Sequence, residues 1–258
     1  MKVAAVISAR TGSTRLDRKV LMNLCGQPLI SHVIRRSMNF PGISSSCDVV
    51  LAIPHGDAEN DLAVIGESNG VTVFRGSEED VLSRVHGAAK AADARVIYRI
   101  TGDNPLIDPG VVFRTWHGFT EGNWDYAVME DTPLGTTAEV ISVEALERAK
   151  YIADSTSINR YREHPTLALY ENGDLFRMRL IPCPDEWNHP DWRFTVDTPE
   201  DHSLVERIMN DLGRDAALEA IVPYIESNPE ILNINRSIKQ EGWKNLKEKK
   251  DAIGKLRV

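Results

Sequence analysis

A group of four cations near the N-terminus is the first feature of the sequence that points to chemistry. Arg10, Arg15, Arg18 and Lys19 lie within ten residues, directly after an apolar run. Residues 11–14, between the first two, are small and polar, so backbone N–H groups can approach a bound anion closely. Cations held this close repel one another unless an anion lies among them. A polyphosphate has enough charge to engage several of them, so we interpret this stretch as a triphosphate-binding loop.

The loop has no common nucleotide-binding motif, and its cations have an alternative explanation. The chain contains neither G-x-x-x-x-G-K-[ST] nor G-x-G-x-x-G, so it has neither of the common nucleotide-loop motifs. The alternative is that the cations at residues 10–19 are solvated surface charges that bind no ligand.

Two aspartates follow predicted buried strands. Asp103 follows residues 96–100 through Thr101 and Gly102, and Asp197 follows a second apolar stretch. The carboxyl ends of parallel strands meet at the edge of a sheet where α/β proteins bind ligands. One or two carboxylates with phosphate oxygens suit Mg²⁺. Singly, each aspartate is explained as a helix cap or Asx turn, but together with the cationic loop they favour a metal site.

An α/β fold is needed to bring these residues together. Apolar runs of strand length alternate with helical segments, which indicates βαβ units and a mainly parallel sheet covered on both faces. The predicted strands are residues 3–9, 48–53, 72–74, 95–100, 126–129, 138–143, 175–181 and 194–198. The predicted helices are residues 28–38, 57–69, 80–92, 109–119, 144–153 and 201–212, with a loop at 182–192. We expect one domain over residues 1–212 and a helical extension over 213–258.

The composition excludes several classes of protein. The chain has 258 residues, of which 42% are hydrophobic and 26% charged, as in ordinary globular proteins. A net charge of −8 argues against a nucleic-acid-coating protein. The apolar runs are too short to span a bilayer, and the first one is better explained as a strand than as a signal peptide. Cys25, Cys47 and Cys183 form no C-x-x-C pair, which indicates reduced thiols and a cytoplasmic protein.

Several motifs, taken in order, resemble a known family. The motifs are ARTGSTRLDRKVL, FRGSEEDVLSR, RITGDNPLID, GTTAEVISVEAL, REHPT and FTVDTPED, and they cover roughly residues 1–210. The chain resembles the cytidylyltransferases that activate 3-deoxy-manno-octulosonate and acylneuraminates as CMP-sugars, and within them the spore-coat polysaccharide biosynthesis branch. Where that family usually has Pro-Gly, this chain has Asp17-Arg18.

The resemblance implies a fold, an activity and partners. The fold is the Rossmann-like nucleotide-diphospho-sugar transferase fold, with a nucleotide half at about 1–134 and an acceptor half at about 135–212. The implied reaction transfers CMP from CTP to an anionic sugar or small acid, with Mg²⁺ as cofactor and pyrophosphate as product, in surface polysaccharide or glycoconjugate biosynthesis. We also expect a homodimer that binds neither nucleic acid nor membrane.

The resemblance further implies roles for particular residues. Arg15, Lys19, Asp103 and Asp197 are the expected catalytic residues, and the two aspartates are the expected metal ligands. The expected nucleotide-binding residues are Ala9, Arg10, Thr11, Gly12, Ser13, Arg75, Gly76, Ser77, Asp80, Arg84, Thr101 and Gly102. The expected acceptor-binding residues are Glu139, Arg160, Arg162, His164 and Arg193, for which surface charges at a helix end are the alternative.

Three other functions stay open from the sequence. A nucleotide-sugar glycosyltransferase typically holds its metal through D-x-D, and no two aspartates of this chain have that spacing. A non-catalytic nucleotide sensor has no need of Lys19, Asp103 and Asp197 together. A nucleotidyltransferase that uses another triphosphate, or a phosphate-ester acceptor, is compatible with the same residues.

Overall fold

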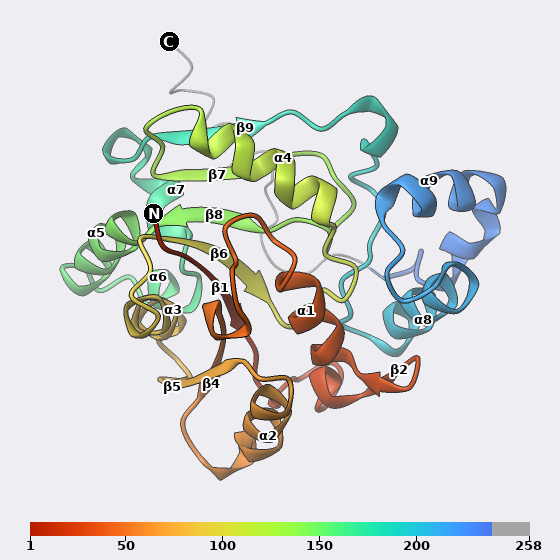
Figure 1. Ribbon diagram of the computed structural model, residues 1–258, viewed down its shortest axis with the longest axis horizontal. Helices are drawn as coiled ribbons and strands as arrows, with labels where there is room; N and C mark the ends of the chain where they lie inside the picture. The colour runs from red at the N-terminus through yellow and green to blue at the C-terminus, as the bar shows by residue number, and fades with distance from the viewer. Residues whose placement is uncertain (239–258) are drawn as a thin grey trace.

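The computed structural model describes residues 1–238 and has a mixed seven-stranded sheet with helices on both faces (Figure 1). The strand order is β5-β4-β1-β6-β8-β7-β9. The first four of these strands are parallel, β8 is antiparallel to both of its neighbours, and β9 is parallel to β7. The strands are β1 (Val3–Ser8), β4 (Val49–Pro54), β5 (Thr72–Gly76), β6 (Val96–Thr101), β7 (Tyr126–Met129), β8 (Glu139–Ser142) and β9 (Met178–Ile181). The predicted α/β class with a mainly parallel mixed sheet is confirmed.

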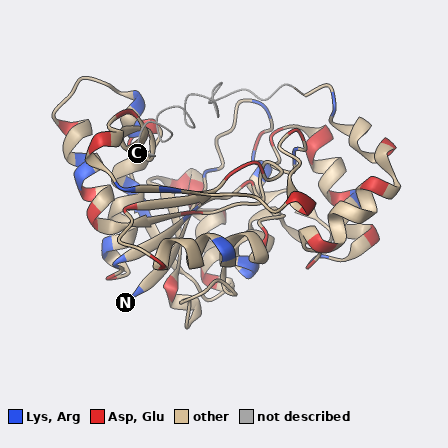
Figure 2. Cartoon of the chain, turned by 90° about the horizontal axis from the view of Figure 1, so that it is seen from above, with Lys and Arg blue, Asp and Glu red and all other residues tan. Residues whose placement is uncertain are grey.

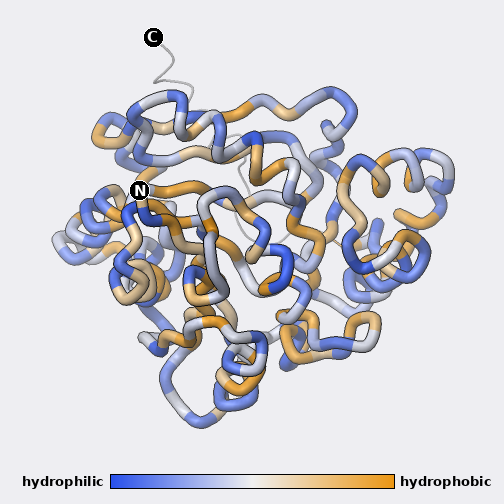
Figure 3. The backbone as a smooth tube through the Cα atoms, in the orientation of Figure 1, coloured by the Kyte–Doolittle hydropathy of each residue, from blue (hydrophilic) through white to orange (hydrophobic). Residues whose placement is uncertain are grey.

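Helices cover the sheet on two sides, and each side has its own apolar core. Strand alternation sends Ala5 and Ile7 of β1 to one core and Ala4 and Val6 to the other. Because both faces are covered, β1 and β4 are apolar almost throughout, as Figure 3 shows for the central strands. The first core takes α1 (Leu29–Ser37), α2 (Asn60–Ser68) and α4 (Pro109–Thr120); the second takes α3 (Val81–Ala91), α5 (Val143–Asp154), α6 (Arg160–Glu163) and α7 (Leu167–Glu171).

The remaining helices form a group at one end of the molecule, on the right in Figure 2. Arg36 of α1 donates hydrogen bonds to the carbonyls of Ile107, Arg214 and Ala216 at 2.8–3.1 Å. This buried guanidinium therefore ties α1 to the segment that joins the last two helices. These helices are α8 (Pro199–Leu212) and α9 (Leu218–Ser227).

Short elements complete the chain. The strands β2 (Asn23–Leu24) and β3 (Gln27–Pro28) form a hairpin whose two turn residues have positive φ, 49° at Cys25 and 85° at Gly26. The 3-10 helices are η1 (Lys19–Leu21), η2 (Ser46–Asp48), η3 (Asp57–Glu59), η4 (Gly173–Leu175), η5 (Asp185–Trp187) and η6 (Pro229–Ile234). Over residues 1–238, none of the helices is both long and apolar enough to cross a membrane.

One predicted strand is wrong, and one predicted segment lies partly outside the description. Residues 194–198 form no strand; a single bridge joins Leu134 to Arg193, and beyond it Val196 N donates to Asp103 O at 2.9 Å. The segment makes only isolated backbone bonds, to Leu134 and to Asp103, so it does not extend the sheet as a strand. The predicted helical extension over 213–258 contains α9 and η6, and its residues 239–258 lie outside the described part. The domain boundary near residue 212 stays a prediction.

Candidate active site

The cationic loop leaves the carboxyl end of β1 and is closed by contacts of its own backbone. Arg18 N donates to Thr11 O at 3.2 Å, and Thr11 N donates to the carboxylate of buried Glu59 at 2.9 Å. Thr11 Oγ1 donates to the same carboxylate, also at 2.9 Å. Thr11 was predicted to bind nucleotide, and the structure places its N–H and hydroxyl against Glu59. Glu59 therefore fixes the base of the loop, a role that the sequence did not indicate.

A glycine lets the ends of β1 and β6 approach each other. Gly102 N donates to Ser8 O at 2.9 Å, and a Cβ added to Gly102 would lie 2.8 Å from Ala9 Cβ and 3.0 Å from Ile30 Cδ1. A larger residue does not fit without displacing one strand end. This close approach carries Asp103, the next residue, to the mouth of the cationic loop.

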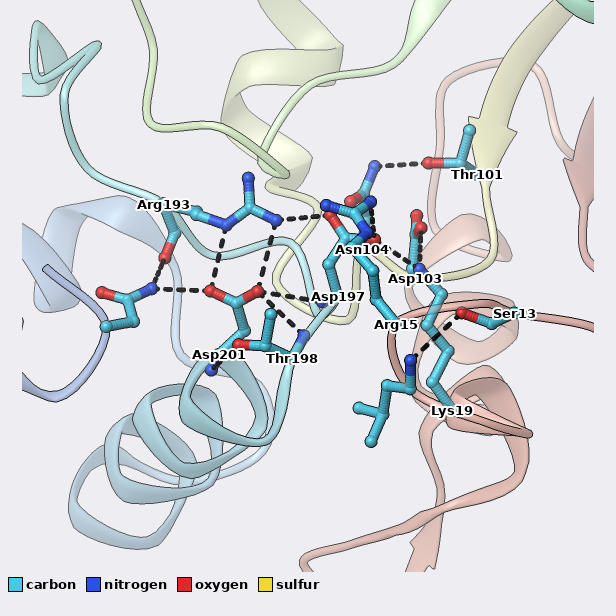
Figure 4. A network of polar contacts seen from close by, with 12 residues as sticks. Ser13, Arg15, Lys19, Thr101, Asp103, Asn104, Arg193, Asp197, Thr198 and Asp201 are labelled. Atoms are coloured by element: carbon cyan, nitrogen blue, oxygen red, sulfur yellow. Dashed lines mark hydrogen bonds and ion pairs between the residues drawn. The ribbon is translucent and has the colours of Figure 1, made fainter. Parts of the chain in front are cut away.

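Lys19 lies between the two predicted metal carboxylates (Figure 4). Its Nζ is 2.6 Å from Asp103 Oδ2 and 2.7 Å from Asp197 Oδ1, and Arg15 Nη2 is 2.9 Å from the same Asp197 oxygen. Only 11% of the Lys19 side chain is exposed. Residues from three distant parts of the chain thus form one polar cluster at the carboxyl edge of the sheet, as the sequence predicts.

The charges of this cluster support one another. Burial alone lowers the pKa of Lys19, but the charges and hydrogen bonds of Asp103 and Asp197 outweigh it, so the pKa is raised. For Asp197 burial favours the neutral acid, yet Lys19, Arg15 and Arg193 bring its pKa below the ordinary value. At neutral pH the charged Lys19 ammonium therefore lies beside an ionised Asp197.

A buried network fixes the second oxygen of Asp197. Arg193 donates from Nη2 to Asp197 Oδ2 and from Nε to Asp201 Oδ1, the latter at 3.0 Å. Asp201 also accepts from Asn235 Nδ2 at 2.9 Å and from the Asp197 backbone N at 3.0 Å. Arg193 was predicted to bind the acceptor; its guanidinium is occupied here, with 8% of the side chain exposed. The sequence showed Asp201 only as part of the start of a helix, where it completes a capping box with Thr198.

Most of the predicted nucleotide-binding residues line one pocket at the ends of β1 and β6. Thr14, Val20 and Ser8 also line it. The predicted residues in this pocket are Ala9, Arg10, Gly12, Ser13, Arg15, Lys19, Arg84, Thr101, Gly102, Asp103 and Asp197. We call it the loop pocket.

A second pocket adjoins it between the start of α3 and α6, and shares Arg10 and Arg84 with it. Asp80 caps α3 by accepting from Ser83 N at 2.8 Å, and it lies 3.6 Å from Arg162 Nε. Asp80 thus caps this helix from a position that is also compatible with the predicted contact to a nucleotide. The predicted residues that line this pocket are Arg10, Ser77, Asp80, Arg84, Arg162 and His164.

Gly76 and Arg84 pack together beside this pocket. A Cβ on Gly76 would lie 2.8 Å from Arg84 Cγ and 3.2 Å from its Cα, so the glycine permits the contact. Arg84 donates from Nη1 to the carbonyls of Ser77 and Glu78, and its burial lowers its pKa. Arg75 points elsewhere: it donates to Gly56 O at 2.8 Å and lies outside the lining of these pockets.

A third pocket lies over β6 and β8 and contains Glu139 and His164. Arg99, which was not predicted, lies in its wall and pairs with Glu139 at 2.6 Å. Arg160 is on the surface, with 59% of its side chain exposed, and pairs with Glu171 at 2.8 Å. The structure therefore brings Glu139 and His164 together and leaves Arg160 apart. We call this cavity the side pocket.

The donor set at the loop pocket fits a magnesium ion shared with a bound phosphate. Asp103 and Asp197 direct oxygens at one cation, the Lys19 ammonium. Carboxylate oxygens are the ligands that Mg²⁺ prefers, and it usually takes one or two of them together with substrate phosphates. In the described part of the chain, no three acidic, His or Cys side chains form a site that could hold a metal without such a substrate.

Comparison with known proteins gives consistent matches over nearly the whole described chain. The family model described as cytidylyltransferase matches residues 4–238. The spore coat polysaccharide biosynthesis protein SpsF of Bacillus subtilis is 30% identical over 231 residues, which are 87% of this chain and 94% of that protein.

Two further similar proteins have names that describe an enzyme. The 3-deoxy-manno-octulosonate cytidylyltransferase of Trichlorobacter lovleyi is 32% identical over 113 residues, 43% of this chain and 42% of that protein. The solved structure of a cytidylyltransferase from Leptospira borgpetersenii superposes with a TM-score of 0.83 at 26% identity, covering 93% of this chain and all of that one.

Proposed function

Because the chain belongs to the cytidylyltransferase family, we propose that it transfers CMP from CTP to a small anionic acceptor, with Mg²⁺ as cofactor and pyrophosphate as the second product. As a member of this family, the chain is a nucleotidyltransferase. The observation that supports the rest is the meeting of Lys19, Asp103 and Asp197 beside the loop pocket. Such a cluster has both the cations for a triphosphate and the carboxylates for a metal.

The cationic side chains of the loop pocket bind and orient the triphosphate in this proposal. Arg10, Arg15 and Lys19 line it at the carboxyl edge of the sheet, where Gly12 and Ser13 leave backbone groups accessible. Lys19 and Arg15 neutralise Asp103 and Asp197 in the nucleotide-free protein. When a triphosphate enters, the same cations turn to its oxygens and free the carboxylates.

The chemistry is an in-line displacement at the α-phosphorus. An acceptor oxygen forms the new P–O bond, the bond to the β-phosphate oxygen breaks, and the acceptor proton passes to solvent. Asp103 and Asp197 hold Mg²⁺, which when bound neutralises charge on the phosphates. Arg15 and Lys19 stabilise the leaving pyrophosphate, where preorganised cations contribute most because charge develops there.

The side pocket is the proposed acceptor site. Arg99 of β6 lines it, two residues from Thr101, which lines the loop pocket, and it contains Glu139 and His164. Two relatives support an acidic sugar and a role in polysaccharide biosynthesis: one is a 3-deoxy-manno-octulosonate cytidylyltransferase, and the other is a spore coat polysaccharide biosynthesis protein. We propose the same class of acceptor and the same kind of biosynthesis here.

Location and assembly belong to the proposal as well. Cys25, Cys47 and Cys183 are unpaired, which is the usual state in the cytoplasm. We propose a cytoplasmic homodimer, and sedimentation of the purified protein distinguishes a dimer from a monomer.

Nucleotide choice tests the proposal most simply. Calorimetry in Mg²⁺ buffer compares CTP with UTP, ATP and GTP. We expect CTP to bind at least about tenfold more tightly than the others, because a pocket that hydrogen-bonds a base edge rejects bases with a different pattern. Equal affinity for all four would contradict the cytidine assignment and leave the fold intact.

A further inference from the structure

Arg99 lies on the face of the sheet that joins the loop pocket to the side pocket. In the β1–β6 pairing Ser8 is opposite Thr101, and in the β6–β8 pairing Arg99 is opposite Glu139. Side chains two residues apart on a strand share a face and lie roughly 7 Å apart, so Arg99 and Thr101 point the same way. Thr101 lines the loop pocket and Arg99 lines the side pocket. One sugar-sized molecule can therefore contact both.

Glu139 holds the Arg99 guanidinium in one place. Arg99 Nη1 donates to Glu139 Oε2 at 2.6 Å, and the two side chains are only 19% and 11% exposed. Glu139 Oε1 accepts from the hydroxyls of Tyr126 at 2.6 Å, Tyr170 at 3.0 Å and Thr166 at 3.3 Å. A carboxylate bound by these donors has one orientation, so it fixes its arginine instead of binding acceptor hydroxyls.

The guanidinium keeps donors for a ligand. Arginine carries five N–H groups, and Nη1 is the nitrogen of Arg99 that Glu139 engages. Arg99 Nε is buried and has no hydrogen-bond partner in residues 1–238. A buried donor without a partner is unfavourable unless a ligand or water accepts from it. The arginine is thus paired on one side and unsatisfied on the other.

His164 stands beside Arg99 and faces both the side pocket and the pocket at α3. Burial, together with the charge of Arg99, lowers the pKa of His164 although Glu163 opposes this. At neutral pH its imidazole is uncharged. Arg99 is therefore the cationic side chain among the residues that line the side pocket, where it lies with the carboxylates of Glu139 and Asp131.

We propose that Arg99 binds the carboxylate of the acceptor, and that Glu139 is its positioning residue. The assignment rests on the proposed function, which it deepens by naming the anionic group and the residue that selects it. A fixed guanidinium matches the planar carboxylate with two parallel hydrogen bonds. The carboxylate held at Arg99 leaves the rest of the acceptor near Thr101, beside the loop pocket where the α-phosphate lies.

The test measures binding without chemistry. Calorimetry in the presence of CMP, which has no pyrophosphate to lose, compares sugar acids with their primary amides. The acids are 3-deoxy-manno-octulosonate, N-acetylneuraminate and gluconate. A phosphate ester of glucose, which has a phosphate in place of the carboxylate, is tested as well. We expect at least one acid to bind about tenfold or more tightly than its amide, since one charge-assisted pair is removed.

Three variants separate recognition from folding. Arg99→Met should weaken binding of that acid by about 10²-fold and leave amide binding nearly unchanged, because the amide loses little by removal of the charge. Arg99→Met leaves the buried Glu139 carboxylate without its cation, which lowers stability. The double variant Arg99→Met/Glu139→Gln removes both charges, so it should be more stable than Arg99→Met and still fail to select the acid over the amide. Arg114→Met, an exposed arginine that packs over Trp187, is the matched control and should bind as the wild type does.

The outcomes are distinct from those for the proposed function. Wild-type protein that binds none of the acids, or that binds acid and amide equally, overturns the assignment of Arg99. So does unchanged acid selection in the double variant, or tighter binding of the phosphate ester than of any acid. Acid binding through Arg99 without turnover of CTP would instead contradict the proposed function and leave this inference standing.

Discussion

Lys19 lies between two carboxylates that the proposal assigns to a metal, so its removal has two opposite consequences. In Lys19→Met, turnover should fall by about 10²-fold or more, because one preorganised charge contact to the leaving group is lost. The same variant should bind Mg²⁺ more tightly than the wild type when no nucleotide is present, since Asp103 and Asp197 lose the ammonium that lies within 2.7 Å of both. Pyrophosphate release and Mg²⁺ calorimetry measure the two effects.

The control for that experiment is an exposed lysine. Lys90→Met removes a charge that lies 4.0 Å from Glu147 on the surface, and it should change neither quantity. Weaker Mg²⁺ binding in Lys19→Met would contradict the view that the ammonium occupies the place of the metal.

Arg18 occupies a position suited to glycine. Its backbone is left-handed, with φ 50° and ψ 28°, and its side chain pairs with Asp61 on the surface. Arg18→Gly and Arg18→Ala both lose that pair, but only alanine keeps the strain of a Cβ in the left-handed region. We expect the glycine variant to be more stable than the alanine variant by about 1 kcal/mol. Urea denaturation measures the difference, and equal stabilities would show that the loop relaxes around residue 18.

At the residue scale, the sequence indicated the members of the cluster but not what holds them. Lys19, Asp103 and Asp197 stood out because their residue types follow strand ends. Glu59 and Arg99 did not, since each one acts through a buried partner that is 40 residues or more away along the chain. Nothing in a local pattern distinguishes such a buried polar pair from a surface charge.

Among the elements, α8 connects the network of Arg193 to Asp197, the proposed metal ligand. Asp201 is fully buried at the start of this helix, binds Arg193 at 3.0 Å and accepts from the Asp197 backbone. Asp201→Asn should lower stability by about 3 kcal/mol, because Arg193 loses one of its buried anions. It should also raise the Mg²⁺ concentration needed for turnover, since Asp197 loses its fixed orientation.

The Mg²⁺ titration distinguishes positioning from capping. A purely capping Asp201 would lower the melting temperature and leave the Mg²⁺ requirement of the remaining folded enzyme unchanged. Asp211→Asn, near the end of the same helix, removes a surface carboxylate that pairs with Arg207 and serves as the control.

His32 makes the packing of α1 sensitive to pH. It is fully buried, its Nε2 lies 2.8 Å from Leu24 O and therefore carries the proton, and burial lowers its pKa. Above the unfolded pKa of 6.5 its contribution is complete; as the pH falls below that value, the unfolded chain takes up a proton that the folded chain resists. Stability should therefore decrease on acidification.

A variant isolates this contribution. His32→Gln keeps a donor for Leu24 O and removes the titration. Between pH 7.5 and 5.5 we expect the wild type to lose on the order of 1 kcal/mol more stability than the variant. Melting curves across this range measure it, and parallel curves for the two proteins would assign the pH dependence to other groups.

Element prediction succeeded where the pattern was periodic or continuously apolar. The strand at 126–129 and the helices α1, α3 and α4 were predicted to within two residues of their ends. A strand buried on both faces gives a continuous apolar run, and a helix buried along one stripe gives an apolar period of 3.6 residues. The predicted strand at 194–198 was wrong because Phe194 and Val196 are buried in the first core while their backbone makes only isolated hydrogen bonds, and burial alone gave the apolar pattern of a strand. The β2–β3 hairpin was missed because its strands have only two residues each.

At the scale of the whole molecule, the fold lines two pockets with residues of one strand, β6. The loop pocket is lined by β1, β6, the loop after β1 and the segment before α8, and the side pocket by β6, β7, β8 and the segment after β7. The helical group at α8 and α9 reaches this edge through Asp201, which accepts from Arg193 and from the Asp197 backbone N. The sequence could place the cluster at the edge of a sheet, but the order of strands and the side pocket required the structure.

The central claim is that Asp103 and Asp197 hold the metal for transfer of CMP from CTP. The direct measurement is pyrophosphate release from CTP across a Mg²⁺ titration, with the sugar acids named above as acceptors, for the wild type, Asp103→Asn and Asp197→Asn, with Asp211→Asn as the control. We predict that each of the two variants loses about 10²-fold or more in rate and needs more Mg²⁺, while CTP affinity falls less because Arg10 and Arg15 remain. An unchanged Mg²⁺ dependence in both variants would contradict the account.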